Sequence, residues 1–190
     1  MESIGGVTAK PAKQLNDSDL KQWANAARDG FVVCSFGSVL KAPSEQILEK
    51  LFHLFSELRP LPVVFKLCRH DLPESLKSKV AENVRLMDWL PQSDLLGHPN
   101  ARLFITHAGT KGYSEALYQV VPMLAFPLIA PQKFMAMPIR IEALGYCKQA
   151  SILTMNGTDL AALAKALLTN RRYQEKVRRI SKIIQARKLL

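Results

Sequence analysis

Six short apolar runs recur along the chain and predict β-strands. They cover residues 31–36, 63–67, 84–87, 103–106, 123–126 and 149–153. Each run is too continuously apolar for a sheet with one face in water, so the pattern predicts a parallel sheet covered by helices on both faces. Ligands of such sheets bind beyond the carboxyl ends of the strands, where we expect the functional site.

The segments between these runs have helical spacing. Residues 43–58 place one apolar stripe on a helix, with Pro43 in its first turn. Residues 130–144 and 158–169 repeat the pattern. These elements predict an α/β, Rossmann-like domain over residues 18–190, which begins with a capped helix near Ser18. Residues 1–17, with two glycines and a proline, predict an extended linker.

Residues 89–132 hold the polar side chains best placed for chemistry. The apolar run 103–106 ends at His107, Ala108, Gly109 and Thr110, and a helix is predicted over residues 113–120. Unpartnered amides in the first turn of a helix can hold a pyrophosphate. Glu115 is expected on that turn, where a carboxylate can accept two hydrogen bonds from a ribose diol.

Together these residues resemble the signature of the UDP-glycosyltransferases, specifically the membrane-bound animal group that includes the UDP-glucuronosyltransferases. The resemblance extends from Gly5-Gly6 and Lys10-Pro11-Ala12, through Ser35-Phe36-Gly37-Ser38, to the basic helices near the end. It implies a GT-B enzyme with two Rossmann-like halves, of which this chain resembles the C-terminal, donor-binding half.

The resemblance also implies a role for each matching residue. Trp89 would stack on uracil, Gln92 would bond the base or ribose, and Glu115 would hold the ribose hydroxyls. The residues that would face the diphosphate are Ser38, His107, Gly109 and Thr110. Gln132 would contact the sugar.

Three residues depart from the family's pattern. Pro131 replaces an Asp that would accept hydrogen bonds from sugar hydroxyls, which puts sugar selectivity in doubt. Ala108 replaces a Gly and is expected to tighten the loop. Lys111 replaces an Asn and would either add positive charge near the phosphates or point into water.

Taken singly, most of these residues have ordinary interpretations. A lone His107 is more often a packing residue, Trp89 a core aromatic, and Glu115 a carboxylate favoured by the helix dipole. Ser38 is equally a turn former. Their order and spacing, rather than any single residue, favour the nucleotide-sugar site.

The net charge of +10 raises the question of an anionic partner. Much of the charge lies in a predicted amphipathic helix near the C-terminus, which would either contact an anionic membrane or nucleic acid, or pack its apolar stripe on the domain. We favour packing, because the stripe is narrow and has few aromatic residues. No nucleic-acid motif is present, and no nucleic-acid partner is expected.

The three cysteines show no Cys-x-x-Cys spacing and no His in a metal-binding pattern, so no metal site is expected. Cys34 and Cys68 fall in or beside predicted core strands, where a reduced, buried thiol is expected.

The function that follows is binding of a UDP-sugar donor, from which a hexosyl or glucuronosyl group passes to a small lipophilic acceptor with inversion. The resemblance places the general base in the N-terminal, acceptor-binding half. We therefore expect no catalytic residue in this chain, no cofactor besides the UDP-sugar substrate, and no turnover by the chain alone. The alternatives are a non-catalytic UDP-binding relative and, less favoured, a basic module for membranes or nucleic acid. A dehydrogenase is disfavoured because no Gly-x-Gly-x-x-Gly follows the first strand.

The sequence shows neither a signal peptide nor about 20 consecutive apolar residues, so the chain itself is expected to be soluble. The resemblance implies that the full-length protein lies on the lumenal side of the endoplasmic-reticulum membrane, reached through segments absent from this chain.

Overall fold

The computed structural model describes residues 9–37, 43–126 and 147–186. Its six strands are β1 (Phe31–Ser35), β2 (Val63–Lys66), β3 (Val84–Met87), β4 (Ala101–Thr106), β5 (Met123–Ala125) and β6 (Cys147–Gln149). Its α-helices are α1 (Ser18–Ala26), α2 (Glu45–Glu57), α3 (Gln92–Leu96), α4 (Thr110–Tyr118), α6 (Gly157–Thr169) and α7 (Arg171–Ala186). Two 3₁₀ helices, η1 (Arg69–Asp71) and η2 (Glu74–Lys79), lie between β2 and β3.

The strands form one parallel sheet in the order β3-β2-β1-β4-β5-β6. After β3 the chain crosses back to the other side of β1, so β1 and β4 are neighbours although residues 36–100 separate them. Ser35 pairs with Thr106 at the carboxyl ends of these two strands. This reversal of strand order is a topological switch point, the usual ligand-binding position of open α/β sheets.

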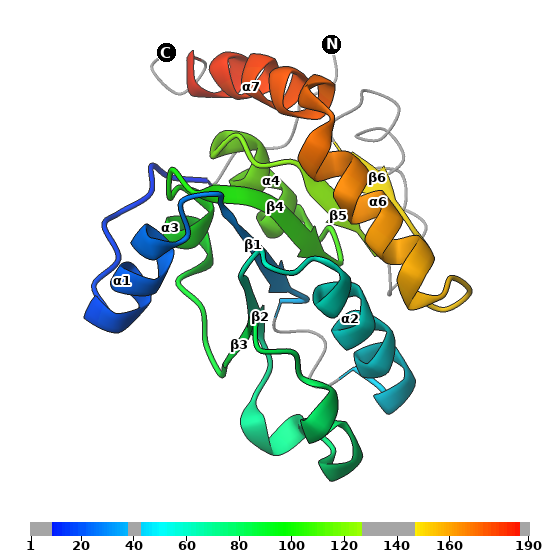
Figure 1. Ribbon diagram of the computed structural model, residues 1–190. Helices are drawn as coiled ribbons and strands as arrows, with labels where there is room; N and C mark the ends of the chain where they lie inside the picture. The colour runs from blue at the N-terminus through cyan, green and yellow to red at the C-terminus, as the bar shows by residue number, and fades with distance from the viewer. Residues whose placement is uncertain (1–8, 38–42, 127–146, 187–190) are drawn as a thin grey trace.

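The alternation of side chains along each strand divides the core in two. Val33 and Phe104 face one cluster, which packs against α1, α3, α4 and α7. Val32 and Ile105 face the other cluster, which packs against α2 and α6. Helices therefore cover both faces of the sheet, as the continuously apolar strands predicted (Figure 1).

The strand expected over residues 149–153 is wrong in position, because β6 ends at Gln149. Ile152 is nonetheless 1% exposed. Its carbonyl and that of Leu153 accept hydrogen bonds from the Lys50 ammonium, both at 2.9 Å, instead of from a neighbouring strand. A loop with one buried apolar side chain and satisfied carbonyls therefore gave the same apolar pattern as a strand.

Two helix boundaries also differ from expectation. Ser44 is the N-cap residue of α2, so Pro43 precedes the helix instead of lying in its first turn. Helix α4 begins at Thr110, three residues before the expected start, because the backbone leaves its extended conformation after Gly109. The helix expected over residues 130–144 lies outside the described residues.

The N-terminal segment lies against the sheet's helices before α1 begins. Ala9 and Leu15 are buried, and the Gln119 amide donates to the Lys10 carbonyl at 3.0 Å. The Lys13 amide donates to the Asp94 carboxylate at 2.8 Å. The chain thus reaches α1 along α3 and α4, while the boundary between linker and domain stays a prediction.

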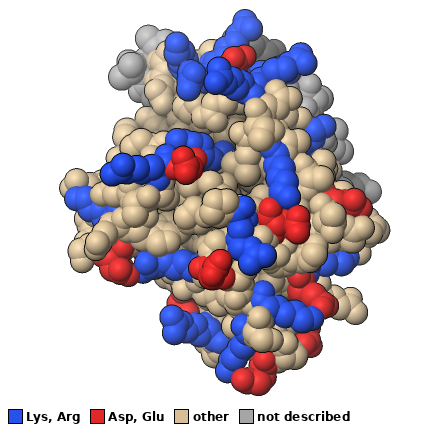
Figure 2. Space-filling model, viewed as in Figure 1, with Lys and Arg blue, Asp and Glu red and all other residues tan. Residues whose placement is uncertain are grey.

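The basic helix α7 packs on the domain, as favoured above. Val177 and Ile184 are buried in the cluster that contains α4. The Ser181 hydroxyl and the Gln185 amide both donate to the Tyr118 carbonyl, at 2.7 and 3.0 Å, at the carboxyl end of α4. The basic side chains of α7 gather on the outer surface at the top of the molecule (Figure 2). No helix among the described residues has the length and hydropathy to cross a bilayer.

A candidate nucleotide-sugar site at the sheet's switch point

Two similar turns leave the carboxyl ends of β1 and β4. The Ser35 hydroxyl accepts from the Gly37 amide at 3.3 Å, and the Thr106 hydroxyl accepts from the Ala108 amide at 3.3 Å. Gly37 and Ala108 both have positive φ, 73° and 56°. A hydroxyl at each strand end thus fixes the backbone two residues later and directs both turns to the same edge of the sheet.

His107 lies between the backbones of two glycines. A Cβ at Gly37 would stand 2.9 Å from the imidazole Cε1, and a Cβ at Gly109 would stand 2.4 Å from Nε2. Neither position has room for a side chain while the ring stays where it is. The two turns therefore hold the imidazole at the switch point.

The His107 ring is set up to act as a neutral hydrogen-bonding group. Its Nδ1 atom is buried and has no hydrogen-bond partner among the described residues. Burial lowers the pKa of His107, because desolvation disfavours the imidazolium. A neutral ring leaves one nitrogen to donate and one to accept.

The start of α4 faces the same edge. Its N-cap residue Gly109 is extended, with φ −62° and ψ 152°, and no side-chain hydrogen bond caps the helix in the described structure. Tyr113 is the first residue whose amide bonds back into the turn, to the Gly109 carbonyl at 3.1 Å. The preceding amides of Thr110, Lys111 and Gly112 carry the positive end of the helix dipole. Thr110 and Lys111 are exposed.

Glu115 lies in the second turn of α4, so its expected place in the first turn is wrong. The residue is 6% exposed, and its carboxylate accepts from the Gln92 amide at 2.7 Å. Gln92 begins α3, which packs against α4. The structure therefore brings together the two residues expected at the ribose, and a partly buried hydrogen bond orients the carboxylate.

Trp89 is not a core aromatic. Its side chain is 68% exposed, in the loop between β3 and Gln92. An exposed indole on a loop has a free face on which a planar ring can stack. Ser38, Gln132 and Pro131 lie outside the described residues, and their expected roles stay predictions.

Lys66 is a residue that the sequence analysis missed. It ends β2, next to β1, and its ammonium donates to the Gly37 carbonyl at 3.1 Å. This bond supports the turn after β1 and adds positive charge beside the switch point. The sequence could have indicated Lys66, because it is a lysine at the carboxyl end of an otherwise apolar strand.

A thiol, an imidazole and a carboxylate also meet at Cys68, His70 and Asp71, which the cysteine spacing did not indicate. Cys34 and Cys147 are buried, whereas Cys68 is partly exposed, so the expectation of a buried thiol is wrong for Cys68. Burial raises the pKa of Cys34 well above its usual range, as expected for an inert core thiol.

The family described as UDP-glucoronosyl and UDP-glucosyl transferase matches residues 1–189 of this sequence. The chain belongs to this family. UDP-glucuronosyltransferase 2A3 of Mus musculus is 35% identical over 182 residues, which are 96% of this chain and 33% of that protein. UDP-glucuronosyltransferase 2B15 of Homo sapiens is 34% identical over 183 residues, with the same two shares. The chain thus spans about a third of the length of these relatives.

Solved structures share the fold. The glycotransferase of kitacinnamycin superposes with a TM-score of 0.73 at 24% identity, over 85% of this chain and 40% of that one. Spinosyn forosaminyltransferase superposes with a TM-score of 0.73 at 19% identity, over 87% of this chain and 42% of that one. These matches confirm the Rossmann-like parallel sheet of a GT-B glycosyltransferase.

Proposed function

We propose that this chain is the donor-binding half of a UDP-glycosyltransferase and holds the UDP part of the donor at the β1/β4 switch point. The observation that carries the proposal is the partly buried Gln92–Glu115 hydrogen bond beside the uncapped start of α4. A carboxylate acceptor and a row of free amides match, in order, the ribose and the diphosphate of a nucleoside diphosphate.

The diphosphate would lie against the first turn of α4. Its oxygens would accept from the amides of Thr110 and Lys111, in the field of the helix dipole. The neutral His107 ring would donate one further hydrogen bond. Lys66 and the exposed Lys111 add positive charge nearby without ion pairs to acidic residues in the described structure. These groups would stabilise the negative charge that develops on UDP as it leaves the sugar.

The uridine would lie toward α3. Glu115 would accept from both ribose hydroxyls, because the Gln92 bond already fixes its orientation. Trp89, three residues before Gln92 and largely exposed, would stack on the uracil ring. Base stacking on an aromatic side chain contributes about 1–3 kcal/mol.

Transfer itself needs groups that this chain is not expected to supply. In the proposed reaction a general base in the N-terminal, acceptor-binding half deprotonates a small lipophilic acceptor, which attacks the anomeric carbon with inversion. The chain alone would therefore bind UDP and leave the donor intact. The same family relationship motivates an endoplasmic-reticulum location for the full-length protein.

A non-catalytic UDP-binding relative is the second candidate, motivated by the residues that depart from the family's pattern. The backbone bears on one of these residues. Ala108 has φ 56°, a left-handed conformation that costs an alanine about 1–2 kcal/mol and that a glycine adopts freely. Ala108 therefore strains the turn, while its effect on the width of the loop stays a prediction.

Titration calorimetry with UDP, UDP-glucose and UDP-glucuronic acid tests the proposal. The donor-binding half should bind UDP, and at least one UDP-sugar should bind more tightly than UDP. Binding of UDP with no gain from either sugar would favour the non-catalytic relative. Absence of UDP binding would refute the site, and sugar transfer to a phenolic acceptor by the chain alone would refute its inactivity.

A further inference from the structure

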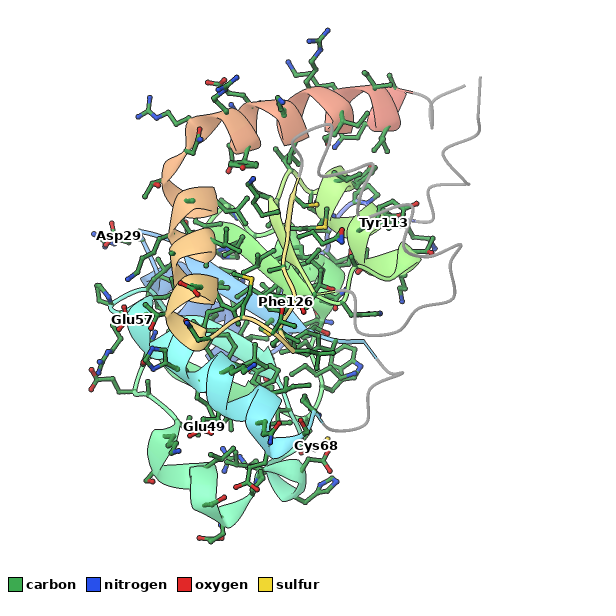
Figure 3. All side chains as sticks on the ribbon, turned by 90° about the vertical axis from the view of Figure 1, so that its right-hand side faces the viewer. Asp29, Glu49, Glu57, Cys68, Tyr113 and Phe126 are labelled. Carbon is green, nitrogen blue, oxygen red and sulfur yellow. The ribbon has the colours of Figure 1, made fainter. Side chains whose placement is uncertain are left out.

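The loop after β2 gathers three metal-binding groups to which the proposed nucleotide site gives no role. The Cys68 thiol, the His70 imidazole and the Asp71 carboxylate have their ligand atoms within 4.8 Å of one another. In Figure 3 Cys68 lies toward the lower end of the molecule, whereas Tyr113 of α4 lies in the upper half. The cluster therefore needs its own explanation.

The backbone that carries the cluster is held from two sides. The Asp71 amide donates to the Cys68 carbonyl at 2.9 Å, which closes the η1 turn. The Arg69 amide donates to the Asp88 carboxylate at 3.1 Å, which attaches the turn to the residue after β3. The three ligand-bearing residues thus start from a defined arrangement, which lowers the entropic cost of joining them to an ion.

The separations suit a tetrahedral ion. With metal–ligand bonds of about 2.0–2.3 Å, the ligand atoms of a tetrahedral zinc site stand roughly 3.3–3.6 Å apart. The His70 Nε2 and Asp71 Oδ1 atoms are already 3.4 Å apart. The remaining contraction is on the order of 1 Å. The His70 side chain is 81% exposed and Asp71 24% exposed, so rotation about side-chain bonds can supply it without disturbing the core.

The donor set selects among metals. A thiolate and an imidazole suit zinc, whereas Mg²⁺ and Ca²⁺ prefer shells of oxygen ligands. Cys68 is the one cysteine of the three that is not buried, so an ion from solution can reach its sulfur. We propose that Cys68, His70 and Asp71 bind one Zn²⁺ ion, with water in the fourth position. The ion would clamp the turn after β2 and, through Arg69 and Asp88, the end of β3.

Metal binding to the metal-free, reduced chain tests this site without any nucleotide. Zn²⁺ is titrated against a chromophoric chelator, and Co²⁺ serves as a spectroscopic substitute whose sulfur-to-metal absorption reports coordination by a thiolate. The wild type should bind one ion per chain and show that absorption. Its unfolding temperature should rise with Zn²⁺.

Each ligand has a variant that keeps its shape: Cys68→Ser, His70→Gln and Asp71→Asn. Each should weaken Zn²⁺ binding at least 10-fold, the lower limit of what even an outer-shell partner contributes to a metal site. Cys34 and Cys147 remain in all three variants. His53→Gln is the matched control, because His53 is exposed and contacts Thr158 instead of the cluster. It should bind Zn²⁺ like the wild type.

Metal-free melting curves check that every variant folds. The three side chains are partly exposed, so the substitutions should cost little packing energy. A wild-type chain that binds no Zn²⁺ overturns the proposal. So does binding that survives the combined Cys68→Ser and His70→Gln changes. Loss in Cys68→Ser alone, with His70→Gln and Asp71→Asn unaffected, also overturns it, because it indicates a lone thiol. None of these outcomes depends on UDP binding, so failure here leaves the proposed function standing.

Discussion

Glu115→Gln separates the proposed role of this carboxylate in binding from its role in the fold. The glutamine keeps the size of the side chain and an oxygen that can accept from Gln92. It removes the charge from both hydrogen bonds to the ribose. A hydrogen bond to a charged group contributes about 1.5–3 kcal/mol and a neutral one about 0.5–1.5 kcal/mol, so two ribose bonds lose about 2–3 kcal/mol together. UDP affinity should fall by about 30- to 150-fold.

The fold should tolerate this change. Glu115 is 6% exposed, so the neutral amide costs less to bury than the carboxylate. The hydrogen bond with Gln92, now 2.7 Å long, loses its charge and becomes weaker. These effects oppose each other, and the unfolding temperature should stay within about 4 °C of the wild type. A loss of affinity with a nearly unchanged melting curve is therefore the expected signature.

Calorimetry with UDP and 2′-deoxy-UDP makes the test sharper. In the wild type, loss of one ribose hydroxyl should cost about 1.5–3 kcal/mol, and in Glu115→Gln only about 0.5–1.5 kcal/mol. Glu82→Gln is the matched control, because Glu82 is exposed and precedes β3, at the opposite end of the strands. It should bind both nucleotides like the wild type. Equal affinity of wild type and Glu115→Gln for UDP, or equal affinity of the wild type for the two nucleotides, would refute the ribose assignment.

Three further predictions follow from the geometry of the site. Trp89→Ala should weaken UDP binding by about 1–3 kcal/mol, measured by calorimetry, and barely change the unfolding temperature, since the indole is 68% exposed. Burial lowers the pKa of His107, so the folded chain binds fewer protons than the unfolded chain below about pH 6.5, and stability should fall as the pH drops through that range. Denaturant unfolding between about pH 7.5 and pH 5 should show a smaller decline for His107→Gln, with a residual decline from His98, whose pKa burial also lowers. Gly109→Ala should destabilise the fold by about 1–3 kcal/mol and weaken UDP binding, because the new Cβ would lie 2.4 Å from the imidazole. Gly112→Ala, whose Cβ would lie 3.4 Å from Phe104, should leave stability unchanged or raise it by up to about 1 kcal/mol; an equal loss in both variants would contradict this account.

The sheet was predictable because strands buried on both faces leave continuous apolar runs, and such runs identified five of the six strands in the described part of the chain. The run that includes Ile152 failed for a physical reason. A lysine from α2 satisfies its carbonyl, so burial there does not require a neighbouring strand. The sequence prediction started α4 too late, because Thr110, Lys111 and Gly112 have the composition of a loop. Only the conformation of Gly109 shows where the helix starts.

Part of the candidate site could be predicted from the order and spacing of its residues along the chain. The contact between Gln92 and Glu115 matches the expectation that both lie at the ribose. The burial of Glu115 was not expected, since it depends on how α3 packs against α4. The Lys66 bond to Gly37 and the Cys68 cluster were missed, because pairing of β1 with β2 and the η1 turn create them.

The position of β1 in the middle of the sheet has a consequence for synthesis of the protein. On a ribosome, residues 31–87 emerge before residues 101–106 and can pair β1 with β2 and β3, while the other side of β1 waits for β4. Until then a nascent chain exposes the unpaired edge of a mostly apolar strand, the kind of surface that chaperones cover and that aggregates readily. The turn that carries His107 follows β4, so a translation product that ends before residue 107 would have β1 but no place for an anion beside it.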